Sequence, residues 1–250
     1  MALRERNLAW EGCYNVRDLG GHATEDGRET RFGSIIRSDS VRNLSEAGWK
    51  ALADHGVTTI VDLRILSELA EDPARELTVE HVHVPVVPEL DSEHWVEIDA
   101  IGEAAPDYPA ATRSVYLEFL ERFRENFARA VVTVAHAPAG PLVIHCQGGK
   151  DRTGLVVALL LRLAGVSIED IAADYAQSEA NLREESLKWI AEAEDEVERA
   201  RRKRIAVSPP ESMVGVLEEV ERRYGSVGDY LKRGGATDDD LELARARLIG

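Results

Sequence analysis

Three short apolar runs give the clearest strand signals in the chain. They are TTIVDL at 58–63, HVHVPVV at 81–87 and PLVIH at 141–145. Each run is rich in β-branched residues and is too short for a buried helix. The pattern therefore predicts three buried strands.

Helical spacing of apolar residues accounts for most of the remaining chain. One broad apolar stripe runs from 112 to 135, and the segment 152–165 is apolar on nearly every face, as is typical of a central buried helix. Further helices are predicted at 45–55, 168–177, 179–204, 210–224 and 238–248. Thr237 is the expected N-cap of the last helix, with Asp240 at its third position.

The order of these elements indicates the fold class. Strands alternate with helices through the first two-thirds of the chain, and no strand signal follows Ser167. This order predicts an α/β fold with a central, mostly parallel sheet flanked by helices and with a helical C-terminal third. Because no linker rich in Pro, Gly or Ser divides the 250 residues, we expect a single domain spanning 1–250.

The net charge of the chain and its first residues limit which partners and which cellular compartment we expect. The formal net charge is -16, whereas a broad surface for nucleic acid needs clustered Lys and Arg, so no nucleic-acid partner is expected. No apolar run could cross a bilayer, and the charged start MALRERNLAW is unlike a signal peptide. We expect a cytoplasmic protein without integral membrane association, with export by a route without a signal peptide left open. The pattern does not indicate an oligomeric state.

The stretch HCQGGKDRTG at 145–154 joins the third strand to the apolar helix. Ligands of open α/β sheets bind at the carboxyl ends of strands, and N–H groups of a glycine-containing turn before a helix attract anions. Cys146 lies at the base of this turn, where N–H dipoles and the Arg152 cation can lower a thiol pKa to roughly 3.5–7.5. The sequence therefore predicts a reactive thiolate beneath an anion site.

The other residues of this stretch have expected roles in binding a phosphate group. Arg152 matches two phosphate oxygens with its guanidinium. Gly149 and its neighbours in the turn allow amides to approach the ligand, while Thr153 is expected to donate its hydroxyl to the sulfur. His145 is expected to fix the loop from behind. The predicted substrate-binding residues are His145, Gln147, Gly148, Gly149, Lys150 and Thr153.

This stretch resembles the loop of the Cys-X5-Arg phosphatases, and within them the bacterial tyrosine and lipid phosphatases whose loop reads HCxxGKDRTG. The segments NVRDLGG at 15–21, RSDS at 37–40 and DLRILSE at 62–68 are similar to further motifs of that family, in the same order. The resemblance covers nearly the whole chain. It implies the cysteine-phosphatase fold.

The resemblance also implies a metal-independent phosphatase that needs no cofactor. The Cys146 thiolate would attack phosphorus in line while Arg152 and the loop amides hold the equatorial oxygens, and water would hydrolyse the cysteinyl-phosphate. The implied partners are phosphotyrosine proteins, with phosphoserine or phosphothreonine proteins and phosphoinositides as further substrate classes. In that family a Lys-Asp pair such as Lys150 and Asp151 accompanies activity on phosphoinositides.

The general acid has three candidates. A leaving alkoxide needs a proton, and a carboxyl group can donate it and later activate water. Asp151 lies inside the loop and is the first candidate. Glu89 and Asp91 follow the second predicted strand, where related sequences carry a mobile acid loop, and they are the alternatives.

Two further pairs of residues are expected to support the site. Asp62 and Arg64 end a strand that should lie beside the loop's strand, and a buried ion pair of Arg64 with Glu68 or Asp62 would brace the site. Asn15 and Arg17 are expected near the pocket, although a structural turn is the alternative.

Other classes of site fit the sequence less well. A nucleotide-binding P-loop would need a glycine where Ile144 stands, and a sulfur transferase would not need Arg152 followed by Thr-Gly. His81 and His83 alternate on a strand, and no neighbour in the sequence completes a metal site with them. A catalytically silent module that binds phosphorylated ligands is the alternative to an enzyme.

Overall fold

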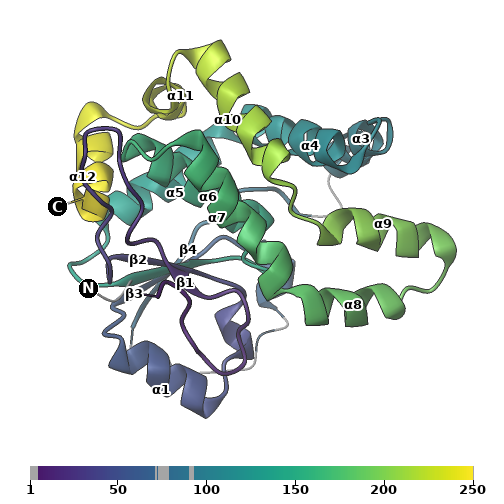
Figure 1. Cartoon of the computed structure of the whole chain (residues 1–250), viewed down its shortest axis with the longest axis horizontal. Coiled ribbons are helices and arrows are strands. Elements are labelled where there is room, and N and C mark those ends of the chain that lie inside the picture. The colour runs from purple at the N-terminus through teal and green to yellow at the C-terminus, as the bar shows by residue number, and fades with distance from the viewer. Residues whose placement is uncertain (1–4, 71, 73–78, 90–92, 250) are drawn as a thin grey trace.

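The centre of the computed structural model is a five-stranded sheet in the order β1-β2-β5-β3-β4 (Figure 1). The structure describes residues 5–70, 72, 79–89 and 93–249. Its strands are β1 (Arg17–Asp18), β2 (Ile35–Ser38), β3 (Thr59–Asp62), β4 (Glu80–His83) and β5 (Leu142–His145). Only β1 runs antiparallel to its neighbour, so the predicted mostly parallel sheet and its three predicted strands are confirmed.

Strands β1 and β2 were not predicted, and their sequences explain why. β2 reads IIRS and β1 reads RD, so neither has the run of apolar residues that marked the other three strands. Every residue of both strands is nevertheless buried. The charged side chains of these strands are stabilised by buried partners elsewhere in the chain, which a local pattern does not reveal.

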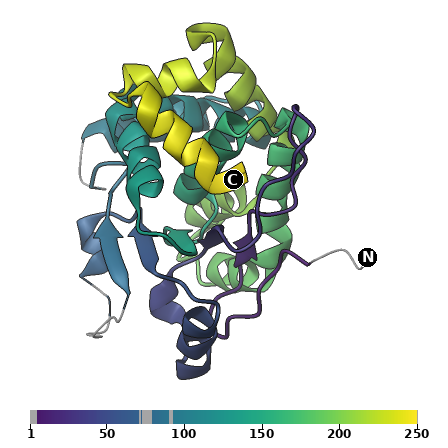
Figure 2. The same ribbon diagram turned by 90° about the vertical axis from the view of Figure 1, so that its left-hand side faces the viewer.

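Helices cover both faces of the sheet (Figures 1 and 2). One face packs on α1 (Glu46–Asp54) around a small apolar core that includes Leu52, Ile60 and Val143. The larger core lies on the other face. The remaining helices are α2 (Leu66–Leu69), α3 (Glu93–Glu103), α4 (Tyr108–Arg122), α5 (Arg124–His136), α6 (Asp151–Leu163), α7 (Ile168–Asn181), α8 (Arg183–Ala191), α9 (Glu196–Ala206), α10 (Pro210–Tyr224), α11 (Val227–Arg233) and α12 (Asp238–Ile249), with one 3-10 turn, η1 (Val41–Asn43).

Two long predicted helices are each interrupted. The stripe at 112–135 belongs to α4 and α5, because Phe123 leaves helical geometry with φ -115° and ψ 28°. The predicted helix at 179–204 is wrong as a single element, because it includes the end of α7, all of α8 and most of α9. Asp195 is the N-cap of α9, because its side chain accepts a hydrogen bond from Glu198 N at 2.7 Å. A new helix therefore begins after Asp195.

The C-terminal third is helical, as expected. The start of α12 confirms the predicted cap, since Asp240 N donates to Thr237 Oγ1 at 3.2 Å and Thr237 N donates to Asp240 Oδ2 at 2.8 Å. The acidic segment after β4 contains α3, which was not predicted. Among the described residues, every helix is too short or too polar to span a bilayer.

The register of the sheet positions the site. β5 lies between β2 and β3, and His145 is paired with Ser38 on one side and with Asp62 on the other. The carboxyl ends of three parallel strands therefore meet at one edge of the sheet, where ligands of such sheets bind. Cys146 leaves β5 at this edge.

Candidate active site

The loop from Cys146 to Lys150, called here the reactive loop, connects β5 directly to α6. Cys146 is buried, with 2% of its surface exposed. Gly149 has φ +63°, and a Cβ at this position would lie 2.3 Å from the carbonyl oxygen of Ser38. Only glycine allows both this conformation and this close approach.

The carbonyl groups of residues 147–149 point away from the loop's centre. Ser40 N donates to the first at 3.0 Å, Asn15 Nδ2 donates to the second and third at 3.1 Å each, and Arg37 Nη2 donates to the third at 2.7 Å. In the described part of the chain, no backbone N–H of residues 147–152 donates to a protein group. These N–H groups and the amino end of α6 together form an anion site.

A buried ion-pair network holds the loop's back side, and we call it the Asp174 network. Asp174 accepts hydrogen bonds from Arg17 Nε at 2.9 Å and from Arg37 Nη1 at 2.6 Å. Arg17 also donates to Asn15 Oδ1 at 2.6 Å, so the Asn15 amide is fixed toward the loop. Burial and the nearby Arg37 lower the pKa of Arg17 to about 10, while the two guanidiniums hold the Asp174 pKa below its usual range despite burial.

Arg152 is held by Glu68 in a bidentate ion pair, with Nη1–Oε2 at 2.5 Å and Nη2–Oε1 at 2.8 Å. Glu68 also accepts a hydrogen bond from Ile65 N at 2.9 Å, which fixes its carboxylate at the start of α2. Burial disfavours the guanidinium, but the bonds to Glu68 and the charge of Cys146 raise the pKa of Arg152. From the sequence, Glu68 was expected only as one of two alternative partners of Arg64.

Arg64 binds Asp62 instead of Glu68. Its Nη2 lies 2.7 Å from Asp62 Oδ2, and Asp72 binds the same guanidinium at 2.8 Å and 2.5 Å. Of the two expected ion pairs, Arg64–Asp62 forms, and Arg64–Glu68 does not because Arg152 takes the Glu68 carboxylate. The final Glu of DLRILSE was the available signal for this role.

Asp151 lies on the first turn of α6 and faces the cavity described below. Its Oδ1 accepts a hydrogen bond from Tyr116 Oη at 2.5 Å and lies 3.3 Å from Lys150 Nζ. Tyr116 Oη lies in turn 2.9 Å from Tyr175 Oη, and burial beside Asp151 raises the pKa of both phenols. Neither tyrosine was selected from the sequence, because buried tyrosines have no local signature.

Lys150 has its ammonium group turned toward the end of α9. Its Nζ donates to the carbonyl oxygens of Ile205 and Val207, the latter at 3.0 Å, and only 6% of the residue is exposed. Lys150 therefore connects the reactive loop with α9. Gln147, by contrast, is exposed at the rim, and Gly148 is half-buried.

Of the two alternative general acids, Glu89 lies within the described residues and Asp91 does not. Glu89 caps α2, because its carboxylate accepts hydrogen bonds from Leu66 N at 2.7 Å and from Ser67 Oγ at 2.7 Å. These bonds, that of Ser67 first, lower the pKa of Glu89. Asp91 lies outside the residues that the structure describes.

His145 and Thr153 are completely buried beside the loop. His145 Nδ1 lies 3.2 Å from the carbonyl oxygen of Cys146, in agreement with the expected contact from behind. Burial lowers the pKa of His145 to about 4. The Thr153 hydroxyl has no hydrogen-bond partner among the described residues, so the expected bond to the sulfur is not formed in this structure.

A cavity of about 240 Å³ opens above Asp151 and Arg152. Its wall is mostly apolar and comes from α3, α4 and α9. The lining side chains include Trp95, Tyr116, Phe119, Arg201 and Arg204. The arrangement therefore combines a buried thiol, a turn with N–H groups directed at one point and an adjoining, mostly apolar cavity with two arginines in its wall.

Comparisons with known proteins agree with this geometry. Residues 8–250 match the tyrosine phosphatase family. A protein of Cupriavidus necator provisionally named tyrosine-protein phosphatase is 30% identical over 258 aligned residues, with 98% of this chain and 87% of the relative covered. The triple specificity protein phosphatase PtpB of Mycobacterium tuberculosis is 29% identical over 284 aligned residues, with 100% of both chains covered. A tyrosine-protein phosphatase of Nostoc commune is 25% identical over 231 aligned residues, with 86% of this chain and 74% of the relative covered. This chain belongs to the tyrosine phosphatase family and is a phosphatase.

Proposed function

We propose that the chain hydrolyses phosphate monoesters through a covalent cysteinyl-phosphate. One observation carries this proposal: Cys146 lies at the base of a loop in which the carbonyl groups of 147–149 point outward and the N–H groups of 147–152 have no partner within the described residues. The sulfur forms a bond to phosphorus as the bond to the leaving oxygen breaks. Water then forms the new P–O bond, phosphate leaves, and the thiolate returns.

Charge on the phosphoryl oxygens is stabilised by groups that are already in place. Glu68 binds both Nη atoms of Arg152, which orients the guanidinium before the reaction begins. The N–H groups of the reactive loop supply the other donors. This preformed neutralisation supports catalysis by Cys146 and Arg152 without a metal ion.

We propose Asp151 as the general acid. It lines the cavity, and within the described residues only its Oδ1 is bonded, to Tyr116 and Lys150, so Oδ2 is available to the leaving oxygen. Glu89 is less suited to this role because its carboxylate caps α2 and is absent from the cavity wall. Asp91 stays an untested alternative.

Phosphotyrosine proteins are the proposed principal substrates, since an aromatic ring suits the apolar wall that contains Trp95 and Phe119. We include phosphoserine and phosphothreonine proteins and phosphoinositides in the proposed range. Arg201 and Arg204 on α9 line the same cavity and would pair with additional phosphates of an inositol ring. The relative named a triple specificity phosphatase supports a range wider than one class.

The test measures phosphate release from a phosphotyrosine peptide, a phosphoserine peptide and phosphoinositide vesicles, with chelator present. Wild type and Cys146→Ser are compared on each substrate, and acid-quenched wild type is analysed by mass spectrometry for a phosphate adduct on Cys146. We expect release by wild type alone, fastest with the phosphotyrosine peptide. Loss of the nucleophile should lower kcat by on the order of 10⁴-fold or more.

Two results would contradict the proposal. Equal release by wild type and Cys146→Ser would show that the thiol is not the nucleophile. Tight binding of the phosphopeptide without any release would instead support a silent phospho-binding module.

A further inference from the structure

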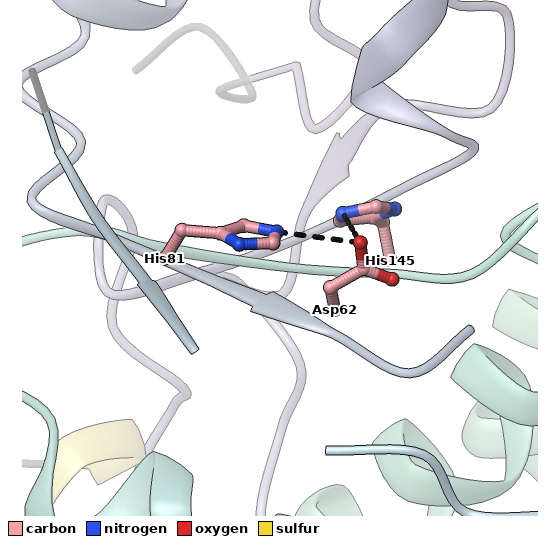
Figure 3. A group of neighbouring side chains, drawn as sticks. All are labelled: Asp62, His81 and His145. Carbon is pink, nitrogen blue, oxygen red and sulfur yellow. Dashed lines mark hydrogen bonds and ion pairs between the residues drawn. The ribbon is translucent and has the colours of Figure 1, made fainter. Parts of the chain in front are cut away.

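Three side chains from neighbouring strands converge behind the reactive loop (Figure 3). Asp62 ends β3, His145 ends β5 in register with it, and His81 extends from β4. Asp62 Oδ2 lies 3.3 Å from His81 Nε2 and 3.5 Å from His145 Nε2. All three atoms lie within 4.8 Å of one another.

The ring of His145 presents a lone pair to this point. Because the Cys146 carbonyl can only accept, the neutral ring carries its hydrogen on Nδ1, 3.2 Å from that oxygen. Nε2 is then an acceptor, and it is buried without a hydrogen-bond partner among the described residues. A buried imidazole acceptor that faces a carboxylate oxygen is unfavourable, and a cation between the two atoms would remove this cost.

The two distances from Asp62 Oδ2 to the imidazole nitrogens suit a transition-metal ion. Ligand bonds of about 2.0–2.1 Å in tetrahedral geometry place neighbouring ligand atoms roughly 3.3–3.4 Å apart. The two distances from Asp62 Oδ2, 3.3 Å and 3.5 Å, are close to this value. One carboxylate and two imidazoles are typical ligands of zinc, with a fourth position left for water. The side chain of His81 is 30% exposed, which gives an ion a route to the site.

Arg64 donates to the same oxygen, Asp62 Oδ2, from Nη2 at 2.7 Å and from Nε at 3.2 Å. Its guanidinium is shared between Asp62 and Asp72, so its charge does not neutralise Asp62 alone. Its backbone carbonyl accepts a hydrogen bond from His83 Nε2 at 2.7 Å, which keeps His83 out of the cluster. Carboxylates that bind metals are commonly oriented by such hydrogen bonds on their other lone pairs.

We propose that Asp62, His81 and His145 bind one divalent transition-metal ion of the zinc class. No metal site was expected from the sequence, because the carboxylate and the second histidine come from neighbouring strands. The ion would lie behind the reactive loop, on the face of the sheet that α1 covers. It would brace the carboxyl ends of β3, β4 and β5, with His145 as the ligand that adjoins the reactive loop.

The test measures metal binding instead of activity. The protein carries Cys146→Ser, so that the reactive thiol cannot bind the ion, and it is stripped with chelator beforehand. Cobalt(II) is titrated and followed by its d–d absorption, and zinc affinity is measured by competition with a chromogenic chelator. We expect one ion per chain, a tetrahedral cobalt spectrum, and at least a ~10-fold loss of affinity when His81→Ala is added.

His83→Ala in the same background is the matched control, because His83 lies on the same face of β4 but, within the described residues, its ring binds the Arg64 carbonyl and not Asp62. It should keep the affinity. A second readout is the melting temperature, which zinc should raise in the Cys146→Ser protein and in its His83→Ala form but not in its His81→Ala form. No saturable binding, or equal affinities of the two histidine variants, would overturn the proposal.

Discussion

The two sides of the reactive loop differ in how their polar groups are satisfied. On the back side, the carbonyls of 147–149 are all hydrogen-bonded, and Asn15 and Arg37 are held by the Asp174 network. On the front side, the N–H groups of 147–152 have no protein partner among the described residues. Because an unpaired N–H costs free energy, the front is stable only as long as the back is rigid. The hydrogen bonds on the back side fix the backbone of the loop, and the N–H groups on the front side can then bind a ligand.

The largest expected effect concerns the proton donor on the front side. Asp151→Asn should lower kcat for an alkyl phosphate by about 10²- to 10⁴-fold, because the leaving alkoxide loses its proton source. A nitrophenyl phosphate, whose leaving group needs no proton, should be affected much less. The pair of rates is measured by phosphate release across pH.

Glu89→Gln serves as the matched control for this prediction. It should leave the leaving-group dependence unchanged, since Glu89 caps α2. A larger loss in Glu89→Gln than in Asp151→Asn on the alkyl substrate would assign the acid to Glu89.

The next effect tests the back side. Asp174→Asn leaves the guanidiniums of Arg17 and Arg37 buried without their carboxylate, which should reduce the free energy of unfolding by about 3–5 kcal/mol. Urea denaturation measures this loss. Asp26→Asn, in an exposed ion pair with Arg28, should have little effect. Similar losses in the two variants would show that the Asp174 network contributes no more to the free energy of unfolding than an exposed ion pair does.

Arg152→Lys separates charge from geometry on the front side. Lysine keeps the positive charge but lacks the planar guanidinium, so kcat/KM should fall by roughly 10²- to 10³-fold. Arg162→Lys, in the same helix but paired with Glu25 and Glu221, should retain nearly full activity. An equal loss in both variants would indicate a general defect of α6 instead.

Glu68→Gln should have a smaller effect, because Arg152 remains but is less well positioned. We expect kcat/KM to fall by about 10-fold, equivalent to one charge-assisted hydrogen bond, with most of the change in kcat. Retention of wild-type kcat would rule out a positioning role for Glu68.

The smallest effect is a pH dependence of stability. The pKa of buried His145 is about 4 against 6.5 for the free side chain, so below pH 6.5 the unfolded chain binds more protons and stability falls. Between pH 7.5 and 5.5 this group should cost about 1 kcal/mol. Urea midpoints in the presence of chelator should show a shallower slope in His145→Gln.

The parts of the fold with a strong local pattern could be predicted from the sequence. The apolar runs marked β3, β4 and β5, and the resemblance of the loop identified the family. The short strand β2 could not be found, because Arg37 and Ser38 contribute no apolar signal and depend on partners distant in sequence. The helix break at Asp195 was missed, because within a charged segment an N-capping aspartate cannot be distinguished from the acidic residues of the neighbouring helices.

The residues of the candidate site also divide into those with a local sequence signal and those without one. Residues 145–153 are contiguous, so their chemistry was visible in the sequence. Tyr116 and Asp174 were not, because each acts only through contacts that the fold creates, and Glu68 was named from the sequence but with Arg64 instead of Arg152 as its partner. Their types are common at surfaces and in cores alike, so no spacing rule selects them.

The pairing of β5 between β2 and β3 has a consequence for how activity is acquired during folding. Its partners lie about a hundred residues upstream, and the bond from Arg17 to Asp174 spans 157 residues. Such non-local closures form late and cooperatively. We therefore expect that the anion site does not assemble in a partly folded chain, and that regain of catalysis after dilution from denaturant reports completed folding of both the sheet and α7.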